Sequence, residues 1–445
     1  MKIIFLLSVV TFSHTLFAQT IINRDPEISQ MISEIAPDSI RNYINTLVGF
    51  GTRNTLSTQS DPKRGIGAAR NWVLKKFNEF SIHSGGRLKA NIDSTTTQPG
   101  KRVDAPGLLG NVLATLKGSD PDEDRVFIMS GHLDNRRSDV MDKTGDAPGA
   151  NDDGSGIAAV IECARIMSTR SFPATIIFVA VSGEEQGLLG STYMAEKVKK
   201  ENRQVEAVLN NDIMGSNNSN GTNITDNTKV RVFSEGLPVY EIEKNATKIR
   251  SLGLENDGKS RQLARYIKET GGRYVDNLEV VMVYRSDRFL RSGDHIPFLE
   301  QGFTAVRITE MNENYTRQHQ DIRVENNIHY GDVAEHVDYE YLRKNTALNL
   351  CNLANLAKAP SMPRDAKIDI KNLSNSTTLS WQPSKSGREK GYYILMRETT
   401  SPVWQKKIYT ANKQITLPYS KDNYLFGVQS VNDAGNESLA VVPTP

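Results

Sequence analysis

Histidine and carboxylate side chains recur in this chain directly after apolar segments. His132 and Asp134 follow the apolar run VFIM. The neighbouring pair Glu184 and Glu185 follows the run TIIFVAV, and Asp212 follows a third such run. Imidazole nitrogen and carboxylate oxygen are the ligands that zinc favours, and a catalytic zinc ion keeps one position open for water. The pattern therefore indicates a metal site that activates water.

Two buried strands with a helix between them must position these side chains. The runs 126–129 and 175–181 are unbroken rather than alternating, which is typical of strands buried on both faces of a parallel sheet. Between them, apolar residues recur at helical spacing over 157–167, and Asp152 and Asp153 stand just before that helix. Open α/β sheets bind ligands at the carboxyl ends of their strands. We therefore expect the acidic side chains and the histidine to meet at that edge.

The number of these residues suits a pair of metal ions. Two ions about 3.5–4 Å apart require one shared ligand and further ligands for each ion. The residues that supply this set are His132, Asp152, Glu185, Asp212 and His319. Adjacent glutamates in extended backbone point to opposite sides, so Glu184 can face the water while Glu185 binds metal. Asp134 lies two residues from His132 and can orient its imidazole.

The remaining segments predict an α/β domain around this unit. Residues 27–85 have helical patterns, and LLGNVLATLKG at 108–118 predicts a strand beside Val126–Met129. Further strands are expected at 205–211, 278–284 and 303–308, and further helices at 188–198, 259–268 and 341–356. The two cysteines, Cys163 and Cys351, lie on apolar helical patterns and are expected to be buried free thiols.

Four motifs, taken in order, resemble those of peptidase family M28, the zinc-dependent exopeptidases that include bacterial aminopeptidases of the leucyl type. The motifs are SGHLD, APGANDDGSG, VSGEEQGLLGS and NNDIMG, and the resemblance covers roughly residues 30–357. It implies a three-layer α/β sandwich, in which a mixed, mostly parallel sheet lies between helices. It also implies two zinc ions per chain and peptide substrates.

The resemblance also implies a role for each site residue. His132 and Asp212 are expected to bind one zinc ion, Glu185 and His319 the other, and Asp152 to bridge the two. The remaining matches are Glu184 as the general base, Asp134 as the partner of the histidine, and a cis peptide bond between Asp152 and Asp153.

The last histidine departs from the pattern of the family. Many members have a YHT phrase, whereas this chain has NYTRQHQ. His319 is chosen because it lies in the loop after the strand expected at 303–308. The competitors are His295, which lies in a segment resembling a structural stretch near the pocket, and His329 and His336, which are expected at the surface or at a helix end.

Within the family, the motifs favour an aminopeptidase. The alternative is a carboxypeptidase or dipeptidase, in which Arg285, Arg288 or Arg291 would bind a substrate carboxylate. Less favoured alternatives are a non-catalytic, receptor-like member and a single-zinc glutaminyl cyclase. Both require missing ligands, whereas His132 and Asp212 are present.

The chain changes character at 359–363, a short linker rich in proline. Catalytic residues are therefore expected within 19–358. Seven strand-like runs follow within 364–445 at the spacing of a β-sandwich. They resemble a fibronectin type III domain, with Trp381 in its core and Tyr424 at its tyrosine corner. Such a domain either contacts polysaccharide or protein, or packs on the catalytic domain.

The N-terminus predicts export. Lys2, the apolar run IIFLLSVVTF and the small residue Ala18 are typical of a signal peptide over 1–18. The mature chain is expected in the periplasm or outside the cell, without a transmembrane anchor. With 54 basic and 52 acidic residues the net charge is +2, or +1 after Lys2 is removed, so nothing suggests a nucleic-acid partner.

Overall fold

The computed structural model describes residue 22, residues 24–371 and residues 373–445. The predicted signal peptide, residues 1–18, lies outside these described residues. Among the helices of the described residues, none combines the length and the hydropathy needed to cross a bilayer.

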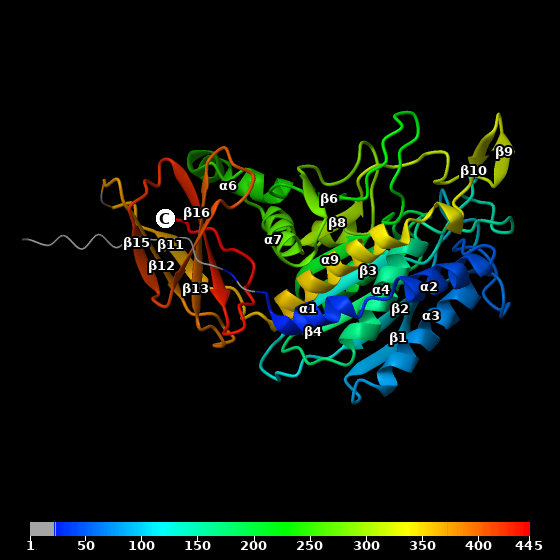
Figure 1. Cartoon of the computed structure of the whole chain (residues 1–445), viewed down its shortest axis with the longest axis horizontal. Helices are drawn as coiled ribbons and strands as arrows, with labels where there is room; N and C mark the ends of the chain where they lie inside the picture. Colours follow the sequence, from blue (N-terminus) through cyan, green and yellow to red (C-terminus); the bar gives the residue numbers. More distant parts are fainter. Residues whose placement is uncertain (1–21, 23, 372) are drawn as a thin grey trace, which may run out of the picture.

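In the described part of the chain, eight strands form one mixed sheet in the order β1-β2-β4-β3-β5-β8-β6-β7 (Figure 1). The strands are β1 (Leu88–Thr96), β2 (Leu108–Leu116), β3 (Arg125–His132), β4 (Thr175–Val181), β5 (Gln204–Asn211), β6 (Lys229–Phe233), β7 (Glu279–Val283) and β8 (Ala305–Glu310). Strands β4, β3, β5 and β8 are parallel neighbours, β1 and β2 are antiparallel additions at one edge, and β6 is antiparallel to β8. The predicted fold class is therefore confirmed.

The central strands are buried on both faces, which is why their sequences are continuously apolar. Every residue of β3 is buried, and β4 is buried from its second residue onward. The prediction that residues 108–118 lie beside Val126–Met129 was wrong. Strand β2 pairs with β4 instead, with Val112 opposite Ala180. The reason is that β4 and β5 occupy both edges of β3, so the hairpin of β1 and β2 adds to the outer edge of β4.

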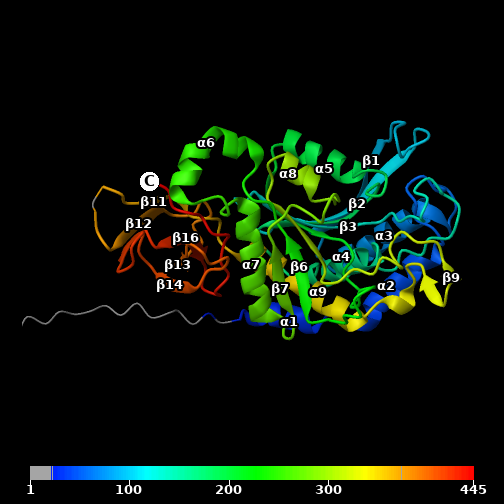
Figure 2. The same ribbon diagram turned by 90° about the horizontal axis from the view of Figure 1, so that it is seen from above.

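Helices cover both faces of this sheet (Figure 2). The helices are α1 (Pro26–Ser33), α2 (Pro37–Gly49), α3 (Gly65–Ile82), α4 (Gly154–Met167), α5 (Leu189–Lys200), α6 (Val239–Leu252), α7 (Lys259–Tyr274), α8 (Ile296–Glu300), the 3-10 helix η1 (Ala334–His336) and α9 (Tyr339–Lys358). Helices α5 and α8 pack on one face, whereas α2, α3, α4, α7 and α9 build the larger core on the other. Cys163 on α4 and Cys351 on α9 are buried there as free thiols, as predicted.

A separate all-β part follows α9. One antiparallel sheet contains β11 (Arg364–Ile368), β12 (Thr377–Gln382) and β15 (Gln414–Leu417), and a second contains β13 (Gly391–Glu398), β14 (Lys406–Thr410) and β16 (Tyr424–Val431). Trp381 and Tyr392 stack edge to face in its core. The seventh predicted strand, 438–442, is not a strand, although Val441 forms an isolated bridge with Val428 and Ser438 accepts a hydrogen bond from Gln429.

Buried ion pairs join this all-β part to α7. Glu437 contacts Arg273 and Lys407, and it is fully buried. Asp257, just before α7, binds Arg397 of β13 at 2.7 Å. The β9–β10 hairpin (Arg323–Glu325 and Ile328–Tyr330) projects at the opposite end of the molecule (Figure 1).

Candidate metal centre

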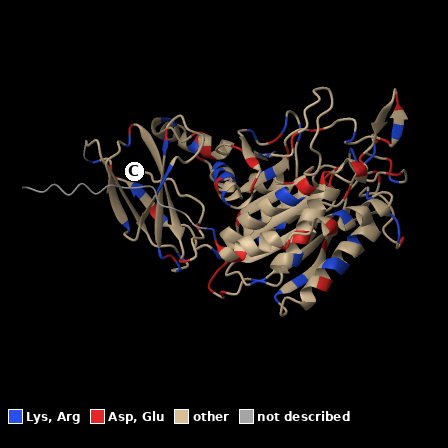
Figure 3. Cartoon of the chain, viewed as in Figure 1, with Lys and Arg blue, Asp and Glu red and all other residues tan. Residues whose placement is uncertain are grey.

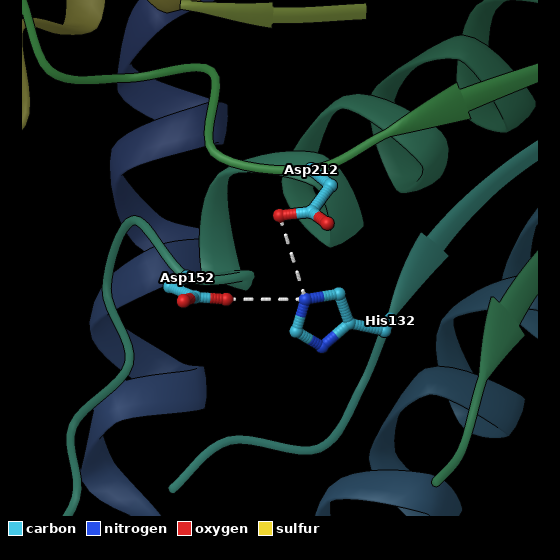
Figure 4. A group of neighbouring side chains, drawn as sticks. All are labelled: His132, Asp152 and Asp212. Atoms are coloured by element: carbon cyan, nitrogen blue, oxygen red, sulfur yellow. Dashed lines mark ion pairs between the residues drawn. The ribbon is translucent and has the colours of Figure 1, made fainter. Parts of the chain in front are cut away.

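The first group of converging side chains lies where β3 and β5 end. His132 is the last residue of β3, and Asp212 directly follows β5. The His132 Nε2 atom lies 3.1 Å from Asp152 Oδ1 and 3.7 Å from Asp212 Oδ1 (Figure 4). All three side chains are almost completely buried. One ring nitrogen and two carboxylate oxygens therefore point into the same small volume.

A second group shares one residue with the first. His319 Nε2 lies 3.0 Å from Asp152 Oδ2 and 3.0 Å from Glu185 Oε1. Asp152 thus turns one carboxylate oxygen toward His132 and the other toward His319. In each group the potential ligand atoms lie within 4.8 Å of one another. We call these five residues, His132, Asp152, Glu185, Asp212 and His319, the candidate metal centre.

The protonation state of His132 makes the fit to a cation specific. Its Nδ1 atom lies 3.0 Å from the backbone oxygen of Asp134. Because that oxygen can only accept, Nδ1 must carry the proton. In the neutral ring Nε2 then carries the lone pair and faces two carboxylates, so a cation, either a proton or a metal ion, is needed between them. A metal ion meets this requirement, since neutral imidazole and carboxylate are its ordinary ligands.

The pKa values of the histidines report the same demand for a cation. Burial lowers the pKa of His132, but Asp152 and Asp212 outweigh burial and raise it well above its ordinary value. For His319 the carboxylates of Glu185 and Asp152 likewise overcome burial and raise the pKa to about 10. In addition, Glu185 Oε1 is buried without a hydrogen bond from any described residue. The donor set thus fits metal ions.

Asp134 contacts His132 through its backbone oxygen and not through its carboxylate. The imidazole of His132 contacts the backbone oxygen of Asp134, whereas the carboxylate lies 3.9 Å away. That carboxylate instead accepts three backbone N–H groups, from Gly183 at 2.9 Å, Glu184 at 3.2 Å and Glu185 at 3.0 Å. Asp134 therefore orients the segment that carries both glutamates.

Glu184 lies beside the candidate metal centre without an engaged carboxylate. It lines a cavity of about 540 Å³ together with all five residues of the centre, which we call the site cavity. Among the described residues none donates a hydrogen bond to its carboxylate. Burial raises the pKa of Glu184 well above its ordinary value, and the neighbouring acids add to this effect against the opposing influence of His132. Its position suits proton transfer in the cavity.

Sequence reasoning missed residues that hold the backbone of the centre. Asp332 accepts the N–H group of Asp152 at 2.7 Å. Asp153 accepts the N–H groups of His132 at 2.9 Å and Ile213 at 3.2 Å, and it also caps α4 through Gly156. The cap of α4 was visible in the sequence as an aspartate before GSG. No signal of this kind marked Asp332. The Asp152–Asp153 peptide bond is cis, as the resemblance implied.

Arg307 was also missed. It is fully buried in β8, and its Nη2 atom lies 3.0 Å from Asp212 Oδ2 while Nη1 lies 3.3 Å from Asp287 Oδ2. Burial raises the pKa of Asp212, but Arg307 and His132 outweigh it and keep that carboxyl ionised. An arginine inside the apolar run AVRITE gave no clue to this contact.

Several residues with left-handed backbone line the site cavity. Leu188, Ile213, Leu290 and His319 have φ values of 61°, 60°, 53° and 52° and all contribute to its wall. Such conformations cost about 1–3 kcal/mol each and persist where the surrounding structure enforces them, often at functional sites. For a β-branched residue such as Ile213 the conformation is especially unfavourable.

The competing histidines lie elsewhere. His295 is buried, with Nε2 2.7 Å from the backbone oxygen of Ser286. His329 is exposed on β10, and His336 is half-buried in η1. Neither these two nor His295 belongs to a group of potential metal ligands among the described residues.

The arginines expected to bind a substrate carboxylate are mostly engaged. Arg285 stacks over the ring of Phe289 at 3.9 Å. Arg288 lies 3.1 Å and Arg291 3.7 Å from Glu313 Oε2, so both already contact a buried acid. The prediction that one of these three is a free carboxylate receptor is not supported by their contacts.

The fold and the candidate metal centre agree with the protein family that sequence comparison identifies. The sequence profile of peptidase family M28 matches residues 111–350, and the chain belongs to this family. A protein of Pyricularia oryzae named "Probable zinc metalloprotease" is 44% identical over 95% of this chain and 85% of its own length. A protein of Leptosphaeria maculans with the same description is 43% identical over 95% of this chain and 97% of its own. The crystal structure of the LapA aminopeptidase of Legionella pneumophila shares the fold, with a TM-score of 0.54 and 20% identity over 79% of this chain and 76% of that chain.

Proposed function

We propose that this protein is a zinc-dependent exopeptidase that removes N-terminal residues from peptides. The observation that carries the proposal is the shared position of Asp152, whose two carboxylate oxygens face His132 and His319 respectively. The description of the relatives as zinc metalloproteases supports zinc. The ordered motifs, which resemble the leucyl branch of the family, support aminopeptidase activity.

The donor set supports two zinc ions. His132 and Asp212 would hold one ion, Glu185 and His319 the other, and Asp152 would contact both. Bound zinc lowers the pKa of a water molecule towards neutrality and polarises the scissile carbonyl group. Asp332 and Asp153 fix the backbone on either side of the shared carboxylate, and Asp134 fixes that of Glu185.

Glu184 would move the proton. Its carboxylate lines the site cavity without a hydrogen-bond donor from the described residues, so it is free to accept a proton from the attacking water. The same group would then donate this proton to the amine of the departing peptide.

Hydrolysis of leucyl substrates and of the corresponding N-blocked dipeptides, with and without a chelator, tests the proposal. We expect release of leucine from the free peptide, little hydrolysis of the blocked one, and loss of activity on chelation that zinc restores. Hydrolysis of blocked dipeptides alone would support a carboxypeptidase. No hydrolysis of either by a zinc-loaded protein would contradict a peptidase and favour a receptor-like member or a glutaminyl cyclase.

We further propose that residues 19–358 are the catalytic domain and 364–445 a fibronectin type III-like domain. The two three-stranded sheets around Trp381 support the second assignment. Glu437 of the all-β part pairs with Arg273, and Arg397 of the all-β part pairs with Asp257. These buried contacts between the two parts favour a packing role over that of a polysaccharide- or protein-binding module.

Export remains a proposal supported by the sequence of residues 1–18. N-terminal sequencing of the native protein tests it, because cleavage after Ala18 leaves Gln19 as the first residue. Recovery of Met1 or Lys2 would contradict export by this route.

A further inference from the structure

Arginine side chains are concentrated in the wall of the site cavity. Four of them, Arg102, Arg136, Arg288 and Arg291, line it together with the candidate metal centre. Elsewhere the two signs of charge are interspersed along the chain (Figure 3). Four acids, Asp152, Glu184, Glu185 and Asp212, line the same cavity, so the charge that the arginines present to a ligand depends on which of them form ion pairs.

Two of the four contact the same buried acid. Arg288 and Arg291 both contact Glu313, whose side chain is only 2% exposed. Glu313 also binds Arg231 at 2.7 Å. These contacts hold Arg288 and Arg291 in the loop after β7. Arg102 and Arg136 differ from them.

Arg136 has no carboxylate partner among the described residues. Its Nε atom donates to the backbone oxygen of Arg137 at 2.9 Å, and its Nη2 atom donates to that of Ser138 at 2.6 Å. The neighbouring Arg137 differs, because it forms ion pairs with Asp142 at 2.5 Å and Asp321 at 3.0 Å. Of two adjacent arginines, Arg137 is paired with two acids, whereas Arg136 lines the cavity without an ion pair to a described residue.

Arg102 likewise forms no ion pair with a described residue. It is exposed on the loop between β1 and β2, and its Nη1 atom donates to the backbone oxygen of Glu185 at 2.9 Å. Arg136 also lies near Glu185, since both line a small recess with Asp152 and His319. Neutral backbone oxygens thus fix both guanidinium groups beside the same part of the metal centre without cancelling their charge.

Among the described residues, none of the acids that line the cavity, Glu184 included, forms an ion pair with Arg102 or Arg136. Asp152 and Glu185 face His319, and Asp212 faces His132 and Arg307. A guanidinium group with free N–H donors in a partly enclosed cavity attracts a planar anion, and carboxylate matches its geometry.

We propose that Arg136 and Arg102 bind a carboxylate group of the peptide substrate and so make the enzyme selective for peptides that carry one near the scissile bond. This inference rests on the proposed peptidase function and adds the class of substrate. The carboxylate has two possible sources, the free C-terminus of a short peptide and an acidic side chain. Both offer the same chemistry to the guanidinium groups.

Four substrates separate these sources. Leu-Gly carries a C-terminal carboxylate, Leu-Glu-NH2 an acidic residue after the scissile bond, Glu-Gly-NH2 an acidic residue before it, and Leu-Gly-NH2 none. A hydrogen-bonded charge pair corresponds to about tenfold to hundredfold in kcat/KM. We expect at least one carboxylate-bearing substrate to exceed Leu-Gly-NH2 by this factor, chiefly through a lower KM.

Charge-removing variants assign the effect to residues. In Arg136→Gln, and to a smaller extent in Arg102→Gln, the ratio of kcat/KM for the preferred substrate over Leu-Gly-NH2 is expected to fall towards one. Arg136→Lys should restore part of it. The matched control is Lys101→Gln, which removes an exposed charge next to Arg102 outside the cavity wall and should leave the ratio unchanged.

A binding measurement gives a readout without turnover. In a Glu184→Gln background, calorimetric titration with the preferred substrate should show at least tenfold weaker binding when Arg136→Gln is added. Wild-type protein that cleaves Leu-Gly-NH2 as well as every acidic substrate would overturn this inference and leave the peptidase function intact. An unchanged ratio in both arginine variants would also overturn it. Failure to cleave any of the four would count against the proposed function itself.

Discussion

The carboxylate of Asp134 accepts the backbone N–H group of Glu185 at 3.0 Å and that of Glu184 at 3.2 Å. One buried side chain thus sets the direction of two adjacent glutamates, one in the candidate metal centre and one free in the site cavity. This carboxylate therefore links the position of Glu184 in the cavity to that of Glu185 in the centre.

Asp134→Asn is expected to disturb both glutamates. Asparagine has one acceptor oxygen, so its amide N–H groups would face a backbone N–H that Asp134 now satisfies. Changes to groups that orient metal ligands typically cost about 10- to 100-fold in metal affinity or activity. We expect a loss of this size in kcat/KM and in zinc affinity, measured by kinetics and competitive metal titration. Asp139→Asn, an exposed change in the same loop, should have no such effect.

Glu184→Gln is expected to separate metal binding from catalysis. Glutamine keeps the size of the side chain but cannot accept the proton, and general-base catalysis contributes about 10²–10⁴-fold. Zinc content by mass spectrometry should stay at the wild-type level while kcat falls by about this factor. Glu196→Gln on α5, also exposed, is the control. A Glu184 variant with wild-type kcat would refute the assigned role.

His319→Ala and His295→Ala are expected to differ in metal content. The first removes the ring nitrogen that lies 3.0 Å from both Asp152 and Glu185, so about one zinc ion per chain should be lost. The second removes a buried ring that binds the backbone of Ser286, which should reduce thermal stability without changing zinc content. Full zinc occupancy in a folded His319 variant would contradict the assignment.

The stability of the chain is expected to fall in acid through Glu437. Burial raises the pKa of this carboxyl, but Lys407 and Arg273 outweigh burial and lower the pKa to about 2. Because the folded pKa is below the unfolded value of about 4.5, the contribution is complete above pH 4.5 and is lost as pH falls towards 2. Thermal unfolding of the full chain between pH 7 and 3 should show this decline.

Glu437→Gln should flatten that pH dependence and lower stability at pH 7. Removing one partner of a buried ion pair costs about 3–5 kcal/mol, because the other charge stays buried. Asp433→Asn, whose side chain is 86% exposed, serves as the control and should leave the pH profile as it is. Equal acid sensitivity of wild type and the Glu437 variant would show that this pair does not couple the two parts.

Local patterns predicted the elements near the centre well. The unbroken runs before His132 and Glu184 predicted buried strands, and β3 and β4 occupy those positions. Strand pairing was harder, because an apolar run such as that of β2 carries no record of its neighbour. The run at 438–442 was also predicted as a strand, yet its bridge from Val441 to Val428 is isolated.

By itself the sequence determined which side chains could form the centre, since ordered motifs and strand ends depend on local spacing. Only the tertiary structure decided what supports and surrounds them. Arg307 reaches Asp212 from a strand 95 residues later, and Asp332 reaches Asp152 across 180 residues. It also decided which arginines form ion pairs, because Arg288 contacts Glu313 whereas Arg136 contacts no acid among the described residues. Contacts of this kind depend on distances in space, and chain order does not encode those distances locally.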